Sequence, residues 1–155
     1  MLEALLNRSS CREFNTKTIE KDKVELLKKL INSSPTAMNS QDFRAVFVTS
    51  KDIKEKFKSY NWDQPHVVDC PLIIVFLTDS TSKFNDVDAL IATGLLTAGA
   101  TELGLSTCII GGIAQHSDDV INLLKVDNKY KVTMGLCVGY SDAKSSPKEP
   151  VNKVL

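Results

Sequence analysis

The sequence has few of the residues that build metal centres and disulfide scaffolds. Its 155 residues include two histidines, His66 and His116, and four cysteines at positions 11, 70, 108 and 137. No two of these cysteines form a C-x-x-C pair, which argues against a zinc site and a thioredoxin-like redox pair. We therefore expect no metal site, and we expect reduced thiols, as in a cytoplasmic protein. We expect both histidines to lie on the surface and to have no role.

An excess of charge of one sign is also absent. Nineteen Lys and Arg balance nineteen Asp and Glu, and the pI is near 6.7. No long block of basic residues occurs, so we expect no nucleic-acid or membrane-surface partner. The apolar start of the chain is short and contains Glu3, so it does not read as a signal peptide. Residues 91–114 contain Glu102 and a helix stop at Gly104, which argues against a membrane span.

What the sequence does contain is typical of one globular domain over residues 1–155. Hydrophobic residues make up 43% and charged residues 25%, an ordinary composition for a chain that folds into a single core. Helices and strands are mixed without the regular βαβ rhythm or Gly fingerprint of a dinucleotide fold. The hydrophobic pattern predicts helices over 18–32, 50–60, 86–103 and a short one from Ser117, and strands over 44–49, 72–77, 106–110 and 131–140.

The predicted helix 86–103 is apolar on nearly every face. Such a helix has to be buried almost all round. A domain of this size has little material to surround it, so we expect a second subunit to cover part of it. Gly94 and Gly99 are the small residues at which another helix can approach closely.

The segment Arg8-Ser9-Ser10-Cys11-Arg12-Glu13-Phe14 is the first candidate binding site. Arg8 and Arg12 present guanidinium groups whose donor geometry matches phosphate oxygens, and Ser9 and Ser10 add hydroxyl donors. The segment is a plausible phosphate clamp, although two Arg near an N-terminus are also common on a solvated surface.

Two further loops of small residues let a ligand approach the backbone. The first contains Pro35, Thr36, Ala37 and Asn39, and the second is the Gly111-Gly112 turn after Ile110. Each of these loops, taken alone, also reads as an ordinary turn. Trp62 reads either as a packing residue or as part of a pocket wall.

Together these segments resemble the FMN-dependent nitroreductase family almost end to end. Residues 8–14 are similar to its R-x-S-x-R-x-F opening, and Ser34-Pro35-Thr36-Ala37-Met38-Asn39-Ser40-Gln41 is similar to its P-S-A-x-N-x-Q loop. Gly104-Leu105-Ser106-Thr107-Cys108-Ile109-Ile110-Gly111-Gly112 resembles its G-L-G-T-C-x-I-G-G segment. Pro147-Lys148-Glu149-Pro150-Val151 resembles its P-R-x-P-L tail. In this sequence Lys148 replaces the family's Arg, and the segments before Pro71 and before Asp86 are short.

The resemblance implies an α+β fold with three α-β-α layers around a mixed, largely antiparallel sheet, in a homodimer with flavin at the interface. It implies non-covalent FMN held by Arg8, Ser9, Ser10, Arg12, Pro35, Thr36, Ala37, Asn39, Ile110, Gly111, Gly112 and Lys148. NADH or NADPH would donate hydride, and a nitroaromatic, quinone or flavin would accept electrons, in a ping-pong reaction. No side chain is predicted to act as acid, base or nucleophile, because the flavin supplies the chemistry.

Two other functions remain open from the sequence. A non-catalytic flavin-binding protein for storage or sensing is compatible with the shortened segments. A dimeric interaction module without cofactor is compatible with the apolar helix alone.

Overall fold

A four-stranded sheet forms the centre of the molecule. The computed structural model describes residues 2–81 and 84–143. The strands β1 (Phe43–Val48), β2 (Leu72–Asp79), β3 (Ser106–Ile110) and β4 (Tyr130–Gly139) pair in the order β1-β2-β4-β3, and every ladder between them is antiparallel. Among residues 2–81 and 84–143, parallel pairing is found at one bridge, between Ser10 and Thr107. These observations confirm the predicted, largely antiparallel sheet.

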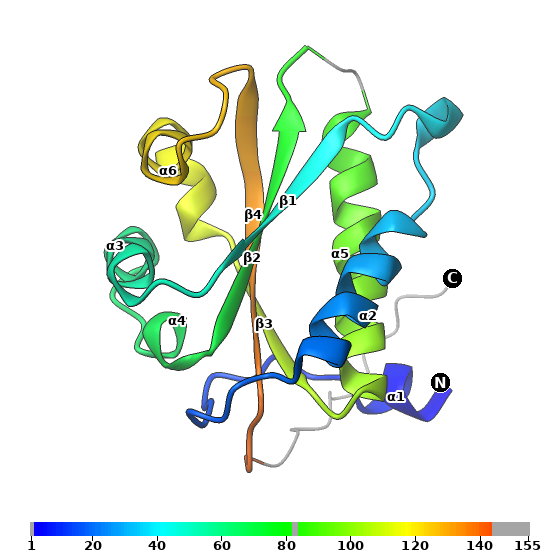
Figure 1. The fold of residues 1–155 in the computed structure, drawn as a ribbon, viewed down its shortest axis with the longest axis vertical. Coiled ribbons are helices and arrows are strands. Elements are labelled where there is room, and N and C mark those ends of the chain that lie inside the picture. Colours follow the sequence, from blue (N-terminus) through cyan, green and yellow to red (C-terminus); the bar gives the residue numbers. More distant parts are fainter. Residues whose placement is uncertain (1, 82–83, 144–155) are drawn as a thin grey trace, which may run out of the picture.

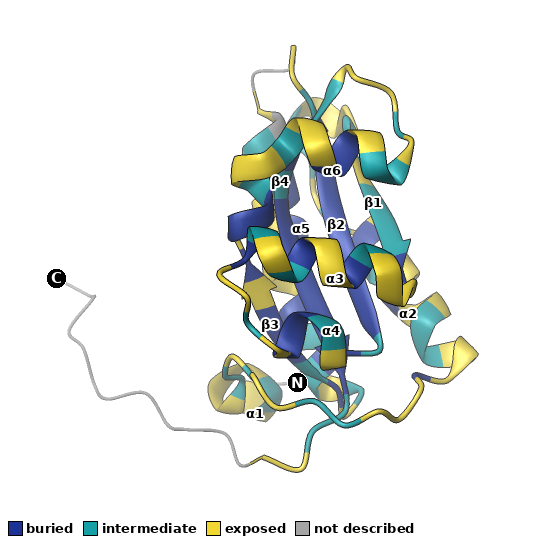
Figure 2. Ribbon diagram, turned by 90° about the vertical axis from the view of Figure 1, so that its left-hand side faces the viewer, coloured by how far each residue is buried: buried dark blue, intermediate teal, exposed yellow. Residues whose placement is uncertain are grey.

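Helices cover both faces of the sheet and complete the predicted three layers (Figure 1). On one face lie α2 (Lys21–Asn32) and α5 (Asn85–Glu102), with α1 (Leu2–Asn7) against the end of α5. On the other face lie α3 (Lys51–Tyr60), α4 (His66–Asp69) and α6 (Ser117–Leu124). Two 3-10 turns, η1 (Ala37–Asn39) and η2 (Gly112–His116), join elements. Each face has its own apolar core, and the central strands between them are buried (Figure 2).

One protomer buries only the inner side of α5, so burial of this helix almost all round, as predicted, would need the second subunit that the sequence suggested. The inner side of the helix packs on the sheet through fully buried residues, of which Ala92 and Leu96 are examples. Its outer side is open: Val87, Leu90, Ile91 and Leu95 are 53, 49, 41 and 43% exposed. A row of apolar residues left in solvent on a helix is a usual mark of an interaction surface.

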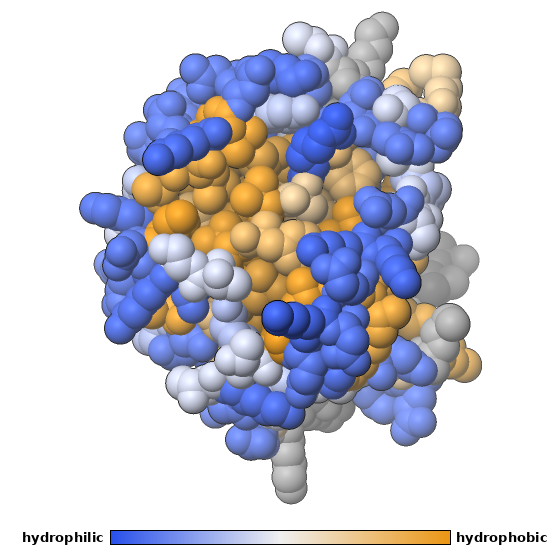
Figure 3. All heavy atoms as spheres, viewed as in Figure 1, coloured by the Kyte–Doolittle hydropathy of each residue, from blue (hydrophilic) through white to orange (hydrophobic). Residues whose placement is uncertain are grey.

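A second apolar surface lies along β1, which is an edge strand of the sheet. Its residues Phe43, Ala45, Val46 and Phe47 are only half buried. In the space-filling view apolar atoms spread over the face that β1 crosses, framed by hydrophilic side chains (Figure 3). The apolar surface of this chain therefore extends beyond the one helix that the sequence singled out.

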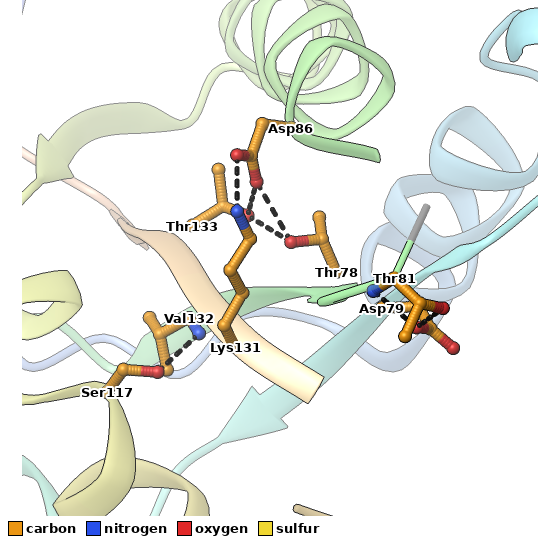
Figure 4. A network of polar contacts seen from close by, with 8 residues as sticks. All are labelled: Thr78, Asp79, Thr81, Asp86, Ser117, Lys131, Val132 and Thr133. Carbon is orange, nitrogen blue, oxygen red and sulfur yellow. Dashed lines mark hydrogen bonds and ion pairs between the residues drawn. The ribbon is translucent and has the colours of Figure 1, made fainter. Parts of the chain in front are cut away.

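A polar network fixes the start of α5 to the sheet (Figure 4). The Asp86 carboxylate accepts hydrogen bonds from Thr78 Oγ1 at 3.0 Å and from Lys131 Nζ at 2.7 Å. These contacts, with Lys131 the largest of the favourable ones, hold the pKa of Asp86 below its usual value despite partial burial. Nearby, Ser117 Oγ at the first residue of α6 accepts the Val132 N–H at 2.8 Å. Because that bond ties α6 to β4, the hydroxyl stabilises packing between elements rather than one helix.

Candidate functional site

The Arg8–Arg12 segment lies beside the start of β3. Cys11 N–H donates to the Thr107 carbonyl at 2.8 Å, and Ser10 forms the parallel bridge to Thr107. A pocket of about 420 Å³ opens next to this segment, lined by residues 7–13 with Thr101, Leu105, Ser106 and Ala143. The structure therefore brings Arg8, Ser9, Ser10 and Arg12 to one pocket, with Arg12 exposed and Arg8 half buried. We call this region the Arg8–Arg12 pocket.

His66 is buried, which corrects the expectation that it lies on the surface. His66 is 3% exposed, and within the described residues its Nε2 has no hydrogen-bond partner. Burial lowers the pKa of His66, and the positive charge of Arg12 lowers it further, whereas Asp69 opposes the change. Both effects favour the neutral imidazole of His66.

The Gly111-Gly112 turn lies at the far end of β3 from the clamp. Gly112 N–H donates to Oδ1 of Asn61 at 3.0 Å, and Asn61 is 2% exposed. A Cβ on Gly112 would lie 2.5 Å from the Tyr60 carbonyl oxygen, whereas a Cβ on Gly111 would meet no atom within 4 Å. Gly112 is thus needed by the fold itself, and Gly111 leaves open space.

The side chain of Ile110, predicted to contact the flavin, is not accessible to a ligand. Its side chain is 1% exposed and belongs to the core between the sheet and α3, α4 and α6. Only its backbone remains for contact with a ligand. Since β3 rises about 3.4 Å per residue, the four steps from Thr107 to Gly111 span about 14 Å. The short strand β3 therefore lies between the Arg8–Arg12 pocket at one end and the Gly111-Gly112 turn at the other.

The loop with Pro35, Thr36, Ala37 and Asn39 is fixed to the first turn of α5. Ala37 N–H donates to the two carboxylate oxygens of Asp88 at 3.1 and 3.2 Å. Inside the loop, Thr36 Oγ1 accepts the Gln41 N–H at 3.2 Å. The backbone N–H of Ala37 and the Thr36 hydroxyl are therefore already engaged within the protein.

One protomer does not bring this loop to the clamp (Figure 1). The loop contacts Asp88 near the start of α5, and Thr101 near the end of α5 lines the Arg8–Arg12 pocket. Asp88 and Thr101 are thirteen positions apart on α5, a distance of about 20 Å at 1.5 Å per residue. Within one protomer the loop and the Arg8–Arg12 pocket therefore lie near opposite ends of α5. The remaining predicted residue, Lys148, lies outside the described residues.

Sequence reasoning missed two residues that hold these loops. Asp88 looks like an ordinary acidic residue in the first turn of a helix, which the helix dipole alone explains. Asn61, which holds the Gly111-Gly112 turn, lies in a polar segment with no motif of its own. Both contacts link residues 51 positions apart. No local pattern signals such a contact.

Among the described residues, no helix is long and apolar enough to cross a membrane. In the same part of the chain no group of three or more His, Cys, Asp or Glu is arranged to hold a metal ion. All four cysteines are free thiols.

Comparisons with known proteins give a consistent result. The chain matches the model of the nitroreductase family over residues 5–71 and 58–140. It is 24% identical over 179 residues to FMN reductase (NAD(P)H) of Bacillus subtilis (strain 168), covering 98% of this chain and 72% of that protein. It is 25% identical to FMN reductase (NADPH) of the same organism, covering 96% and 68%. An FMN-dependent nitroreductase from Clostridium difficile R20291 superimposes with a TM-score of 0.85 at 25% identity, covering 96% of this chain and 92% of that one.

Proposed function

The chain belongs to the nitroreductase family, and we propose that it is an FMN-dependent oxidoreductase that uses NADH or NADPH to reduce a small aromatic acceptor. The observation that supports the proposal is the Arg8–Arg12 pocket, which two arginines and two serines line. The relatives named FMN reductase and FMN-dependent nitroreductase support the activity. The acceptor classes that fit are nitroaromatics, quinones and free flavins.

The donors of the pocket suit the phosphate of FMN. A phosphate monoester carries about −1.5 to −2 charges at neutral pH and three acceptor oxygens. Arg8 and Arg12 supply the opposing charge, and Ser9 and Ser10 supply neutral donors. The Gly111 backbone, with no atom within 4 Å of its missing Cβ, leaves room for a flat ring to approach. These residues would hold the cofactor without a covalent bond.

The residues of this chain bind and orient rather than react. Bound FMN supplies the hydride chemistry, so no acid or base is required from the protein. His66, at 3% exposure, is too buried to exchange a proton with substrate. Donor and acceptor would then use the same exposed ring face in turn, which is a ping-pong reaction.

We also propose that the working unit is a homodimer with the flavin at its interface. A groove of about 590 Å³ runs between α1, α2 and α5, lined mainly by Leu5, Leu26, Leu30, Leu95, Ala98 and Leu103. It continues into the open side of α5. A partner docked there would cover both surfaces. The partner's Pro35–Asn39 loop would then lie beside the Arg8–Arg12 pocket of the first chain, which the first chain's own loop does not reach.

Two organisational proposals accompany this function. Residues 1–155 form one FMN-binding domain, as the two cores on either side of one sheet support. The free thiols support a cytoplasmic location, where cysteines stay reduced.

An absorbance spectrum and an anaerobic titration test the proposal. The purified protein should be yellow, or become yellow with FMN, and NADH or NADPH should bleach it. A nitroaromatic or quinone should then restore the colour. Bound FMN that neither nicotinamide reduces would instead indicate flavin storage or sensing. A protein that takes up no FMN would refute the flavin site altogether.

A further inference from the structure

The buried carboxylate of Asp88 holds the loop of residues 35–41 in place. Asp88 lies in the first turn of α5 and is 3% exposed. Both of its carboxylate oxygens face the Ala37 N–H, at 3.1 and 3.2 Å. A buried charge is costly unless hydrogen bonds compensate it. The bond from Ala37 N–H therefore compensates part of the cost of burying Asp88, and it fixes the loop to α5.

The loop that Asp88 holds has an unfavourable backbone. Met38, Asn39 and Gln41 have φ angles of 52, 56 and 54°. Side chains other than Gly rarely adopt this left-handed region, and such residues persist only where their surroundings impose the conformation. The hydrogen bonds of Asn39 N–H to the Thr36 carbonyl and of Gln41 N–H to Thr36 Oγ1 stay within the loop. The Asp88 contact ties the loop to the rest of the domain.

The contact also decides which groups the loop presents to its surroundings. Because Ala37 N–H is bound to Asp88, it is not free to donate to a ligand. Met38 is 91% exposed, and Asn39 is exposed beside it. A flat ring that meets this loop would therefore contact the Met38 and Asn39 positions, not the amide of Ala37.

We propose that Asp88 is a positioning residue of the flavin site, which pre-forms the 35–41 loop as the wall that meets the ring. This inference rests on the proposed FMN site and on the partner protomer supplying the loop. Without the Asp88 carboxylate the loop would sample other conformations. Flavin binding would then include the free-energy cost of ordering the loop.

Two substitutions remove the contact from opposite sides. Asp88→Ala removes the acceptor, and Ala37→Pro removes the donor without altering α5. Pro suits the Ala37 position, because this is the first residue of η1 and Thr36 before it is extended, with φ −132° and ψ 150°. Asp88→Asn keeps one oxygen that can accept the Ala37 N–H. Thr93→Val is the matched control, since Thr93 is 1% exposed, lies on the same helix and donates only to the Ala89 carbonyl at 2.8 Å.

The first measurement is hydrogen–deuterium exchange of a peptide over residues 34–42 in the apo-protein. Asp88→Ala and Ala37→Pro should speed exchange in this peptide, whereas Asp88→Asn and Thr93→Val should leave it near wild type. Unchanged exchange in the first two variants overturns the role of Asp88 in fixing the loop. This result does not depend on whether the protein binds flavin.

The second measurement is FMN affinity by fluorescence titration, with the visible circular dichroism of the bound flavin at saturation. Asp88→Ala and Ala37→Pro should weaken binding about ten- to a hundredfold and alter the dichroism. Asp88→Asn should restore both toward wild type. Faster loop exchange with wild-type affinity and dichroism would overturn the link to the flavin site. Failure of the wild type to bind FMN would refute the proposed function, and the exchange result would still report on the loop.

Discussion

Gly112 offers a sharp test of how the β3 turn is built. Its Cβ, if present, would lie 2.5 Å from the Tyr60 carbonyl oxygen and 2.7 Å from Asn61 Oδ1. Backbone and a buried amide cannot move aside as the end of a flexible side chain can. Gly112→Ala must therefore push the Tyr60–Asn61 segment away from the turn and break the 3.0 Å bond between Gly112 N–H and Asn61.

The expected loss of stability follows from these two effects. Overpacking a tight site costs about 1–3 kcal/mol. Leaving the buried Asn61 oxygen without a donor costs about 1–3 kcal/mol more. Because both describe one displacement, we expect a combined loss of roughly 2–5 kcal/mol. At about 2–4 °C per kcal/mol for a domain of this size, Tm should fall by roughly 5–15 °C.

The neighbouring glycine supplies the control for this measurement. Gly111 has φ −88° and ψ −24°, which any residue adopts, and its Cβ would meet no atom within 4 Å. Gly111→Ala should thus be neutral or raise stability by about 0.4–1 kcal/mol through the unfolded state. Thermal unfolding of the two apo-proteins by circular dichroism gives the comparison. Equal Tm values for both variants would refute the proposed packing of the turn.

Three further predictions concern the clamp, the dimer and the buried histidine. Arg12→Ala should weaken FMN binding roughly ten- to a hundredfold, as expected for one charge-assisted contact, and unchanged retention on dialysis would remove Arg12 from the clamp. Gly94→Leu should be tolerated by one chain, where no atom lies within 4 Å of its Cβ, but should dissociate the dimer and reduce FMN binding in sedimentation experiments; a persistent dimer would contradict this use of α5. His66 has a lowered pKa in the folded chain, so its stability contribution is complete above the unfolded pKa of about 6.5 and is lost as the pH falls toward the folded value. His66→Gln should flatten the stability curve below about pH 6.5, and an unchanged slope would show that His66 does not titrate differently in the folded and unfolded chains.

Local patterns predicted the elements well and their meeting points poorly. The strand over 106–110 was predicted with its observed bounds, and the helix predicted over 86–103 is observed one residue earlier. Both predictions succeeded because hydrophobic periodicity is set by residues that are close in the sequence. It did not predict α4 or the burial of His66, because a short polar segment becomes buried only through the elements packed above it.

The candidate site shows the same division. Charge and hydroxyl content marked residues 8–12, but their position beside Thr107 depends on a bridge across almost a hundred residues. The loop of Ala37 was recognised as a loop, but its attachment to Asp88 and its distance from the clamp follow from the tertiary structure. Gly99, expected at a contact with another subunit, packs first on its own chain, where its Cβ would lie against Leu30.

The distance that α5 places between the clamp and the Pro35–Asn39 loop has a genetic consequence. In the proposed dimer each flavin draws its clamp from one chain and its loop from the other. A chain defective only in the clamp and a chain defective only in the loop would each be inactive as a homodimer. When both are expressed together, the mixed dimer concentrates both defects in one site and leaves the other site intact. Two inactive alleles would then complement each other, which no arrangement with a complete site in every chain permits.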